Sequence, residues 1–395
     1  LNPVLPRWLG TVDLASDPSG VALEVDGAPA TACPATPCRI PLMIGHHVVS
    51  APDDFVPWSQ AVDLARGQVV QVHPQLTRKT GTLSVNAPPG QLLMDGNQVA
   101  GGPWTAQVAT GHHSLVFRSP ATWPATAGVD VGWNQTSEVA IQPSPVVPGD
   151  TASFQAALKA YLGGIQGSSG VWIQELGSGR TLGLNQDAKL EAASVIKVPE
   201  ALYLLHQVDA GAVKLTDQVS LQSDDFMSGT GILYGQAHPG DQISYQDLLT
   251  DLIRYSDNTA WLALRRVLGS SSIDGYAASL GAGDCGQQSD MCTAQEAGTL
   301  FVKLAGGSVL GPTSTQLLLG LLESTVYNDR INYYLPGVTI AHKVGMDGGV
   351  MNDCGIVYAT GSPFVVCVFT DGPDSNSGIQ AIRDISRAAN HYFGH

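Results

Sequence analysis

The sequence predicts a multi-domain protein in which two small all-β sandwich repeats precede an α+β domain with an antiparallel sheet and a helical block. Three observations support this prediction. The chain has 395 residues, more than a single hydrophobic core usually organises. Its N-terminal part contains an internal repeat of short strands separated by turn residues. Beyond a proline-rich stretch, "QPSPVVPGDT" (142–151), strand patterns at both ends of the remaining chain enclose a series of helical patterns.

The internal repeat is carried by turn residues and alternating apolar positions. "GTVDLASDPSGVALEVDG" (10–27) matches "GTLSVNAPPGQLLMDG" (81–96), and "IGHHVVSAPDDF" (44–55) matches "TGHHSLVFRSPATW" (110–123), with a period of 66 to 71 residues. Strands joined by such turns predict two small β-sandwiches, which we place at 1–78 and 79–145. Their motif order resembles that of the PEGA-type domains found on extracytoplasmic bacterial proteins.

Each copy of the repeat contains a Gly-His-His triplet, with His46 and His47 in the first copy and His112 and His113 in the second. Such histidine pairs are either metal ligands or residues at the edge of a turn. We favour turn-edge residues, because the whole unit around the histidines is repeated and not the histidines alone.

The rest of the chain, 146–395, changes in character. "TASFQAALKAYLGGI" predicts a helix, "SGVWIQELGSGRTLGLN" a β-hairpin, and helical patterns follow from Ala192 to about Leu304. The chain then closes with the strands "TIAHKVG", "DCGIVYAT" and "FVVCVFT" and the helix "SGIQAIRDISRAANHYF". We therefore expect one antiparallel sheet whose strands come from both ends of the domain.

Charge and hydropathy exclude two classes of partner. The net charge is −15 and the pI is near 4.9, whereas nucleic-acid binding needs clustered Lys and Arg. No apolar run approaches the ~20 residues of a membrane-spanning helix. The chain begins "LNPVLPRW" without an initiator Met, as expected for a trimmed mature form.

Six cysteines fall into three near pairs: Cys33 and Cys38, Cys285 and Cys292, Cys354 and Cys367. They could be buried thiols or zinc ligands, but no pair has C-x-x-C spacing and no histidine lies near enough to complete a zinc site. The last pair flanks a predicted hairpin and would face across its two strands. We favour three local disulfides formed in an oxidising compartment.

Three short motifs occur in order within the C-terminal domain: Ser194-Val-Ile-Lys197, Ser256-Asp257-Asn258 and Lys343-Val344-Gly345. The ordered set S-x-x-K, S-D-N and K-T-G resembles that of penicillin-binding proteins and class A β-lactamases. "SGTGILYG" (228–235) is similar to the corresponding family segment. The resemblance covers residues 150–395 and implies a class A β-lactamase-like fold and a serine hydrolase.

The residue types fit this chemistry on physical grounds. A separation of three residues on a helix returns Lys197 to the face of Ser194. Burial and the nearby Lys343 would lower the pKa of the Lys197 amine, so that it could take the serine proton. A helix N-terminus also favours a developing oxyanion. We expect Ser194 to be the nucleophile and Lys197 its base.

The other motif residues receive supporting roles. Ser256 would relay a proton to the leaving nitrogen, and Asn258 would orient Lys197 and bind the acyl-amide side chain of the substrate. Lys343 would attract a substrate carboxylate, with Gly345 beside it in the substrate site. By resemblance, the backbone N–H groups of Ser194 and Met346 would form the oxyanion hole. We expect no metal and no organic cofactor.

The sequence departs from the family pattern in three places. No Glu-x-x-Leu-Asn Ω-loop follows S-D-N, and we expect a short loop closed by Cys285 and Cys292 to replace it. A substitute hydrolytic base would have to come from the acidic residues there: Asp274, Asp284, Asp290 and Glu296. Val344 replaces the hydroxyl residue that helps bind a carboxylate, a loss of about 1–3 kcal/mol. Pro199 is expected to bend the helix of the nucleophile early.

We therefore predict an extracytoplasmic, secreted or envelope-associated bacterial enzyme whose Ser194 is acylated by a β-lactam or a cell-wall peptide ending in D-Ala-D-Ala. Deacylation would be slow without the Ω-loop glutamate. Two alternatives remain at this point. One is a true β-lactamase with a substitute base, and the other is a non-catalytic envelope-binding protein. The β-repeats would contact cell-envelope material.

Overall fold

The computed structural model describes residues 8–372 and 374–394, and the chain divides into two compact units. The first contains the residues up to Arg118 together with Ala125–Gln142, and the second contains Ser119–Pro124 and the residues from Pro143 onward. The first seven residues of the predicted 1–78 domain lie outside the described residues.

The first copy of the repeat folds into two small sheets that share one hydrophobic core. The strand orders are β4-β1-β7 and β3-β2-β5-β6. Inward-facing residues of both sheets, such as Leu14 of β1 and Val49 of β5, are fully buried in this core. The strands are β1 (Leu9–Leu14), β2 (Glu24–Val25), β3 (Ala28–Pro29), β4 (Cys38–Met43), β5 (Gly45–Ser50), β6 (Ser59–Leu64) and β7 (Val69–Val72).

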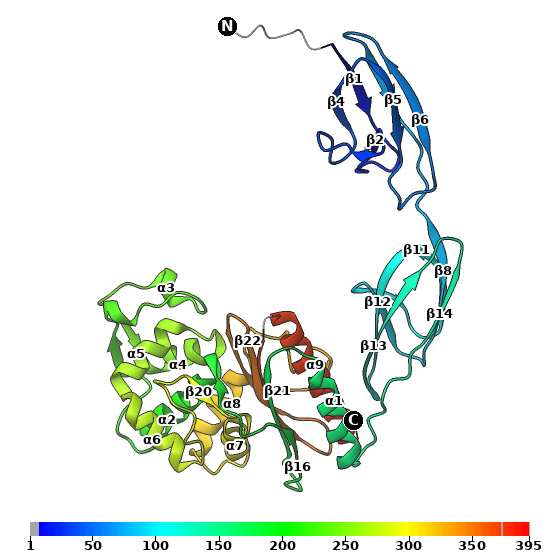
Figure 1. Cartoon of the computed structure of the whole chain (residues 1–395). Helices are drawn as coiled ribbons and strands as arrows, with labels where there is room; N and C mark the ends of the chain where they lie inside the picture. Colours follow the sequence, from blue (N-terminus) through cyan, green and yellow to red (C-terminus); the bar gives the residue numbers. More distant parts are fainter. Residues whose placement is uncertain (1–7, 373, 395) are drawn as a thin grey trace. The chain divides into compact units, whose positions relative to one another are not determined.

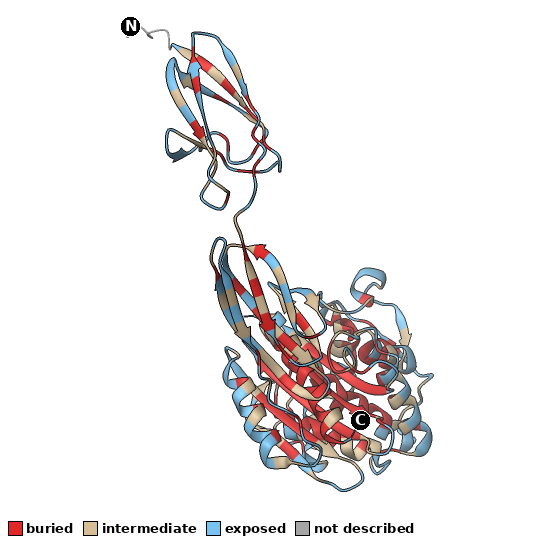
Figure 2. Cartoon of the chain, turned by 90° about the vertical axis from the view of Figure 1, so that its right-hand side faces the viewer, coloured by how far each residue is buried: buried red, intermediate tan, exposed pale blue. Residues whose placement is uncertain are grey.

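The second copy repeats this topology strand for strand. Its sheets have the orders β11-β8-β14 and β10-β9-β12-β13, and β8 pairs with β14 in parallel as β1 pairs with β7. In both copies buried and more exposed residues alternate along the strands (Figure 2). The strands are β8 (Thr80–Asn86), β9 (Gln91–Met94), β10 (Asn97–Ala100), β11 (Trp104–Ala109), β12 (Gly111–Ser119), β13 (Thr122–Val131) and β14 (Thr136–Ala140). The sequence repeat is therefore a repeat of a small two-sheet fold.

The second unit is built on a five-stranded sheet of order β16-β15-β23-β22-β21, all of whose neighbours are antiparallel. As predicted, two strands precede the helical block in sequence and three follow it. The strands are β15 (Ser168–Glu175), β16 (Thr181–Leu184), β21 (Ile340–Asp347), β22 (Val350–Val357) and β23 (Phe364–Asp371). Almost every residue of β22 and β23 is buried, because helices cover both faces of the sheet.

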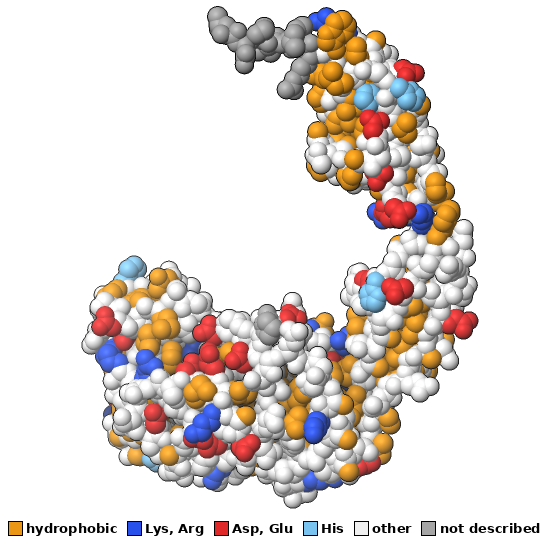
Figure 3. All heavy atoms as spheres, in the orientation of Figure 1, with side chains coloured by type: hydrophobic (Ala, Val, Ile, Leu, Met, Phe, Trp, Pro, Cys, Tyr) orange, Lys and Arg blue, Asp and Glu red, His pale blue; other side chains and the backbone are white. Residues whose placement is uncertain are grey.

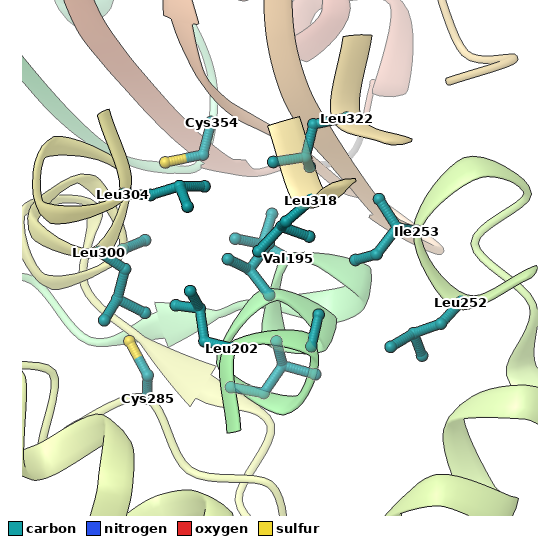
Figure 4. Close-up of a cluster of buried hydrophobic side chains, with 14 of the residues drawn as sticks. Val195, Leu202, Leu252, Ile253, Cys285, Leu300, Leu304, Leu318, Leu322 and Cys354 are labelled. Atoms are coloured by element: carbon teal, nitrogen blue, oxygen red, sulfur yellow. The ribbon is translucent and has the colours of Figure 1, made fainter. Parts of the chain in front are cut away.

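Helices α1 (Thr151–Gly163) and α9 (Ser375–Tyr392) pack on one face of this sheet (Figure 1). A helical block lies on the other face, around a core that includes Val195, Leu202, Leu300 and Leu318 (Figure 4). Its helices are η1 (Ala193–Ile196), α2 (Lys197–Asp209), η2 (Ser223–Asp225), α3 (Leu233–Gln236), α4 (Tyr245–Arg254), α5 (Asn258–Leu268), α6 (Ser270–Ser279), α7 (Ala294–Ala305) and α8 (Pro312–Glu323). The sheet and this block meet at η1, which lies against β21 and precedes α2.

Short strand pairs complete the block: β17 (Leu190–Glu191) with β20 (Met291–Cys292), and β18 (Gln218–Ser220) with β19 (Gln242–Ser244). The first pair joins the chain just before η1 to the loop that ends at Cys292. None of the described helices is long and apolar enough to cross a membrane.

All six cysteines are paired as predicted, in the disulfides Cys33–Cys38, Cys285–Cys292 and Cys354–Cys367. The last pair joins directly opposite residues of β22 and β23.

Two details differ from the sequence analysis. Pro199, expected to bend the helix, is the third residue of α2, in the first turn, where N–H groups have no acceptor within that helix, so the proline removes no hydrogen bond within α2. The proline-rich stretch is also anchored. Val146 is buried in the core of the second unit, and the N–H of Trp123 donates to the carbonyl of Ser144 at 2.8 Å.

Candidate active site

Ser194 lies in the one-turn helix η1, half-buried at the wall of a pocket. The backbone before it is held from both sides. The N–H of Ala192 donates to the carbonyl of Asp290 at 2.7 Å, and the carbonyl of Ala192 accepts from Nδ2 of Asn352 at 3.1 Å. Ala193 has φ of +43°, a conformation that is rare outside glycine and occurs often at functional sites. This fixed turn aims the serine at the pocket.

Lys197 begins α2, one turn after Ser194, and only 1 % of it is exposed. Its Nζ donates to the carbonyl oxygen of Ser256 at 2.6 Å and to Oδ1 of Asn258 at 2.7 Å. Burial lowers the pKa of this amine to about 7, although three acidic neighbours act in the opposite direction. Near neutral pH a substantial fraction of Lys197 is therefore an uncharged amine that can accept a proton.

Lys343, on β21, is equally buried, and its Nζ donates to Oγ of Ser256 at 2.8 Å and to the carbonyl of Val344 at 2.9 Å. Burial holds the pKa of Lys343 well below its ordinary value, and the charge of Lys197 lowers it further. We expected both burial and Lys343 to lower the pKa of Lys197, and burial is the cause there. Repulsion between the two amines instead contributes to the lowered pKa of Lys343. The Oγ of Ser256 lies between two amines that can exchange a proton through it.

The Ser256-Asp257-Asn258 turn is fixed by a capping carboxylate. Oδ1 of Asp257 accepts from the N–H of Ala260 at 2.9 Å, which caps α5, and Oδ2 accepts from the N–H of Leu233 at 2.8 Å. A Cβ at Gly231 would overlap this carboxylate, and Gly231 has φ of +108°. Asp257 is therefore a structural residue, and the preceding Ser256 has a left-handed conformation with φ of +55°.

The "SGTG" segment, 228–231, part of the stretch that resembles the family, is hydrogen-bonded to the Ser256-Asp257-Asn258 turn. Oγ1 of Thr230 donates to the carbonyl of Ser256 at 2.6 Å, and its own carbonyl accepts from the N–H of Asn258 at 3.1 Å. Nδ2 of Asn258 donates to the carbonyl of Ser228 at 2.9 Å. The segment orients Asn258 toward Lys197, and because an amide carries two N–H groups, one can still serve a substrate.

The predicted oxyanion-hole strand lies against the nucleophile. A Cβ at Gly345 would stand 2.5 Å from the carbonyl oxygen of Ala192 and 3.3 Å from the nitrogen of Ser194, so only glycine fits. Met346 follows on β21, which is an edge strand with no strand partner on one side among the residues that the structure describes. The buried Arg330 donates to the carbonyl of Gly345 at 3.0 Å and thereby stiffens this strand.

A pocket of about 100 Å³ opens in front of these residues. Its walls include Ser194, Lys197, Asn258, Met227, Trp261, Asp290 and Asp347. In Figure 3 acidic side chains gather on the visible face of this unit. Ser194, Lys197 and Asn258 thus share one cavity, and Ser256 and Lys343 join them through hydrogen bonds to Lys197 and to each other.

Of the four acidic residues considered as substitute bases, three are used elsewhere. Asp284 forms an ion pair with Lys189 at 2.6 Å, and Oε2 of Glu296 accepts from the N–H of Asp284 at 2.8 Å. Oδ1 of Asp274 accepts from the N–H of Gln287 at 2.8 Å. None of these three lines the pocket of Ser194.

Asp290 is the fourth, and it lines the pocket. Its Oδ1 is buried without a hydrogen-bond partner among the described residues. Burial raises the pKa of Asp290 to about 7, and the carboxylates of Glu191 and Asp347 raise it further. The short disulfide loop therefore does place a carboxyl group beside the nucleophile.

Val344 lies where the resemblance expects a hydroxyl residue. Only 1 % of it is exposed, and it pairs with Asp353 across β21 and β22. A valine side chain offers no hydrogen bond to a substrate carboxylate, as expected from the sequence.

Gln287 is a positioning residue that the sequence analysis missed. Nε2 of Gln287 donates to the carbonyl of Ile196 at 2.8 Å, and its Oε1 accepts from Nε1 of Trp261 at 3.0 Å. Gln287 thus ties the disulfide loop to η1 and α5. No short motif marks such a residue, because its partners come from three distant segments.

Glu200 was also missed, although it lies one turn beyond Lys197 on α2. It is completely buried, and neither carboxyl oxygen has a hydrogen-bond partner among the described residues. Burial raises the pKa of Glu200 well above its ordinary value, while the charges of Lys197 and Arg265 act in the opposite direction.

The Gly-His-His triplets form the same contacts in both repeats. Nδ1 of His47 lies 2.7 Å from Oδ2 of Asp26, and its Nε2 lies 2.7 Å from the carbonyl of Met43. His113 makes the equivalent contacts, with Nδ1 2.6 Å from Oδ2 of Asp95. The outer histidines, His46 and His112, each lie 2.9 Å from an aspartate, Asp63 and Asp130. All four histidines lie at the start of a strand, β5 or β12, and each contacts an aspartate carboxylate. This placement agrees with the turn-edge interpretation.

One group of potential metal ligands is found among the described residues: Cys285, Cys292 and Glu296, whose ligand atoms lie within 4.8 Å of one another. The two sulfur atoms are bonded to each other, so only reduction of that disulfide would free them as ligands.

Comparison with known proteins agrees with this geometry. Residues 153–393 match the model of the "Beta-lactamase enzyme family". Among curated proteins, the chain is 29% identical over 226 residues to the extended-spectrum beta-lactamase PER-1 of Pseudomonas aeruginosa, covering 50% of this chain and 73% of that protein. It is 34% identical over 122 residues to the D-alanyl-D-alanine carboxypeptidase DacC of Escherichia coli (strain K12), covering 28% of this chain and 30% of that protein.

A solved structure also matches. The L158E mutant of PBP-A, described as an acyl-enzyme complex with penicillin G, superposes with a TM-score of 0.58 and 26% identity, covering 62% of this chain and 98% of that one. The match extends over nearly the whole of that structure.

Proposed function

The chain belongs to the beta-lactamase enzyme family and is a serine hydrolase, and on that premise we propose that Ser194 is acylated by a β-lactam or by a D-alanyl-D-alanine-like amide, with slow deacylation. The observation that carries the proposal is the buried amine of Lys197, whose hydrogen-bond acceptors come from the Ser256-Asp257-Asn258 turn. An amine with a pKa of about 7, one helical turn from a serine, is suited to take its proton.

In the proposed acylation, residues of the first two motifs move the proton and bind the substrate. Lys197 takes the proton of Ser194 as Oγ attacks the carbonyl carbon, and the N–H groups of Ser194 and Met346 stabilise the oxyanion. The proton then passes through Ser256 to the leaving nitrogen as the C–N bond breaks. Asn258 binds the acyl side chain of the substrate. The geometry at Ser256, with an amine on either side of its hydroxyl, supports the relay.

The site offers fewer hydrogen-bond donors to a substrate carboxylate than the family pattern does. Val344 contributes no hydrogen bond, and Nζ of Lys343 already donates to Ser256 and to a backbone carbonyl. We propose that Lys343 attracts the carboxylate mainly through its charge, beside Gly345. Weak carboxylate binding would slow acylation without changing its chemistry.

Slow deacylation is proposed because the sequence has no Glu-x-x-Leu-Asn segment to hold a hydrolytic water. A second candidate, an efficient β-lactamase, is favoured by one observation, the presence of Asp290 in the pocket. Turnover of a chromogenic cephalosporin separates the two. Many turnovers per active site would support the second candidate, and a single burst would support the first.

The test of the proposal is intact-protein mass spectrometry over time after addition of penicillin G, with Ser194→Ala as control. We expect the mass to increase by one penicillin, to persist for many minutes, and not to appear in the variant. An equal adduct on Ser194→Ala, or no adduct on either protein, would contradict the assignment of the nucleophile. It would also revive the alternative of a non-catalytic envelope-binding protein.

We further propose that the protein is extracytoplasmic and that its N-terminal unit consists of PEGA-like repeats that contact cell-envelope material. Three disulfides support an oxidising compartment. Co-sedimentation of full-length Ser194→Ala with purified peptidoglycan tests the envelope contact without acyl transfer. Binding that survives an excess of penicillin G would support the repeats as the site, whereas absence of binding would contradict it.

A further inference from the structure

We propose that Asp290 is the general base that activates water for deacylation of Ser194. This inference rests on the proposed acyl-enzyme and names the residue that promotes its hydrolysis. It assigns a catalytic task to the short loop 285–292, which stands where the family pattern has a much longer one.

The first argument is position. Asp290 and Ser194 line the same pocket of about 100 Å³, together with Lys197 and Asn258. The carbonyl of Asp290 accepts the N–H of Ala192, two residues before the nucleophile, at 2.7 Å. The backbone of Asp290 is therefore linked to the turn that carries the serine, so the loop cannot move away from Ser194 without breaking that link.

The second argument is that the carboxyl group is held ready and has no structural task. Asp290 has φ of +52°, one of three left-handed non-glycine residues at the site together with Ala193 and Ser256. Its Oδ1 is buried without a hydrogen-bond partner among the described residues. A buried polar atom without a partner costs free energy, and such atoms need an explanation in a native structure. Asp290 thus places a carboxyl group at the wall of the pocket that Ser194 also lines, and no hydrogen bond among the described residues ties its Oδ1 to the fold.

The third argument is that the loop is rigid. The disulfide Cys285–Cys292 closes its ends, and the N–H of Asp290 donates to the carbonyl of Gly286 at 3.0 Å. Gln287, 1 % exposed, is bonded through its side chain to η1 and to Trp261. A catalytic base must hold its position, and this loop meets that condition although it is short.

The proposed step conserves atoms and charge. The Asp290 carboxylate takes a proton from water as the water oxygen bonds to the acyl carbon, giving a tetrahedral intermediate whose oxyanion faces the backbone N–H groups of Ser194 and Met346. The bond from the acyl carbon to Oγ of Ser194 then breaks. Protonated Asp290 then gives its proton to Oγ of Ser194, which restores both the carboxylate and the serine hydroxyl, and the product leaves as a carboxylic acid.

This role is compatible with slow deacylation. Burial, Glu191 and Asp347 raise the pKa of Asp290 to about 7, while Lys197 and Arg265 act in the opposite direction. Near neutral pH the carboxyl group is therefore only partly in the basic form. Deacylation should accelerate as the pH rises through about 7 and then level off.

The test compares Asp290→Asn, which preserves shape, with Asp284→Asn, which changes the aspartate at the other end of the loop. Each full-length protein is acylated with penicillin G, freed of excess drug, and followed by mass as the adduct disappears. We expect Asp290→Asn to slow deacylation at least tenfold more than it changes acylation, and Asp284→Asn to change neither rate. Equal deacylation by Asp290→Asn and the parent would overturn the inference.

Two further outcomes separate this inference from the proposed function. An adduct of the parent protein that never decays would overturn the role of Asp290 and leave the acyl-enzyme intact, whereas absence of any adduct would overturn both. If Asp290→Asn does not fold, Asp290→Ser takes its place, because Lys197 also has a pKa of about 7 and a pH profile alone would not separate the two groups. Deacylation at least tenfold slower in Asp290→Ser supports the inference, and an unchanged rate overturns it.

Discussion

Nζ of Lys343 donates a 2.8 Å hydrogen bond to Oγ of Ser256, joining two residues that are 87 positions apart in the sequence. The same Oγ lies 3.4 Å from Nζ of Lys197. A hydroxyl held between two buried amines with lowered pKa values is a proton relay that needs no movement of the backbone. This relationship links the S-x-x-K helix, the S-D-N turn and the K-x-G strand into one unit.

Removal of that hydroxyl should disable acylation. We expect Ser256→Ala to reduce the acylation rate with penicillin G by about 10²–10⁴-fold, the usual range for loss of a general acid–base group. Ser228→Ala is the matched control, because Asn258 uses only the backbone carbonyl of Ser228. Stopped-flow or quenched mass spectrometry measures both rates. Equal rates for Ser256→Ala and the parent would show that the proton takes another route.

The acylation rate should depend on the protonation of Lys197. Its pKa is about 7, and only the neutral amine accepts a proton, so the rate should rise with pH through about 7 and then become constant. Lys197→Met should remove this dependence and lower the rate by about 10²–10⁴-fold. The check is the acylation rate between pH 5 and 9. A rate that falls as the pH rises would contradict the role of Lys197 as base.

Val344 offers a gain-of-function prediction. Val344→Thr should strengthen binding of carboxylate-bearing β-lactams by about 1–3 kcal/mol, because it adds one hydrogen bond to a charged group. Penicillin G and its methyl ester provide the control within one protein, since only the free acid should benefit. The measurement is the second-order acylation rate constant. An equal change for acid and ester would mean that the effect comes from packing.

Gly231 should tolerate no side chain. It has φ of +108°, and a Cβ would overlap the carboxylate of Asp257, so we expect Gly231→Ala to lower the free energy of unfolding by at least about 1–3 kcal/mol. Acylation should also fall, because Ser256 and Asn258 flank that carboxylate. Gly235→Ala is the control, since a Cβ there meets no atom within 4 Å. Thermal unfolding of both variants gives the comparison.

The histidine–aspartate contacts make the repeats sensitive to pH. Hydrogen bonding to Asp26 raises the pKa of His47, and hydrogen bonding to Asp95 raises that of His113. The stabilisation is complete below the unfolded-state pKa of about 6.5 and is lost as the pH rises through the higher folded-state values. Titration of the imidazole signals by NMR should show both pKa values above 6.5, and His47→Gln should remove only one titration. A pKa below 6.5 would contradict the prediction.

Much of the architecture could be read from residue patterns. The duplicated turns predicted two copies of one small β-fold, and the three cysteine pairs predicted three disulfides that the structure contains. The ordered motifs around Ser194, Ser256 and Lys343 identified residues that do meet at one site. These signals are local in sequence, and turns, strand alternation and helical spacing depend mainly on neighbouring residues.

The sequence did not distinguish among the four acidic residues after the S-D-N turn. Asp284 and Asp290 look alike in sequence, yet the first pairs with Lys189 and the second lines the pocket. It also gave no sign of Gln287 or Glu200, because burial and hydrogen-bond partners depend on segments brought together by folding. The sequence alone determined which chemistry the chain carries. Only the tertiary structure decided which groups are desolvated beside the nucleophile, since desolvation is set by packing and in turn sets the pKa values of Lys197 and Asp290.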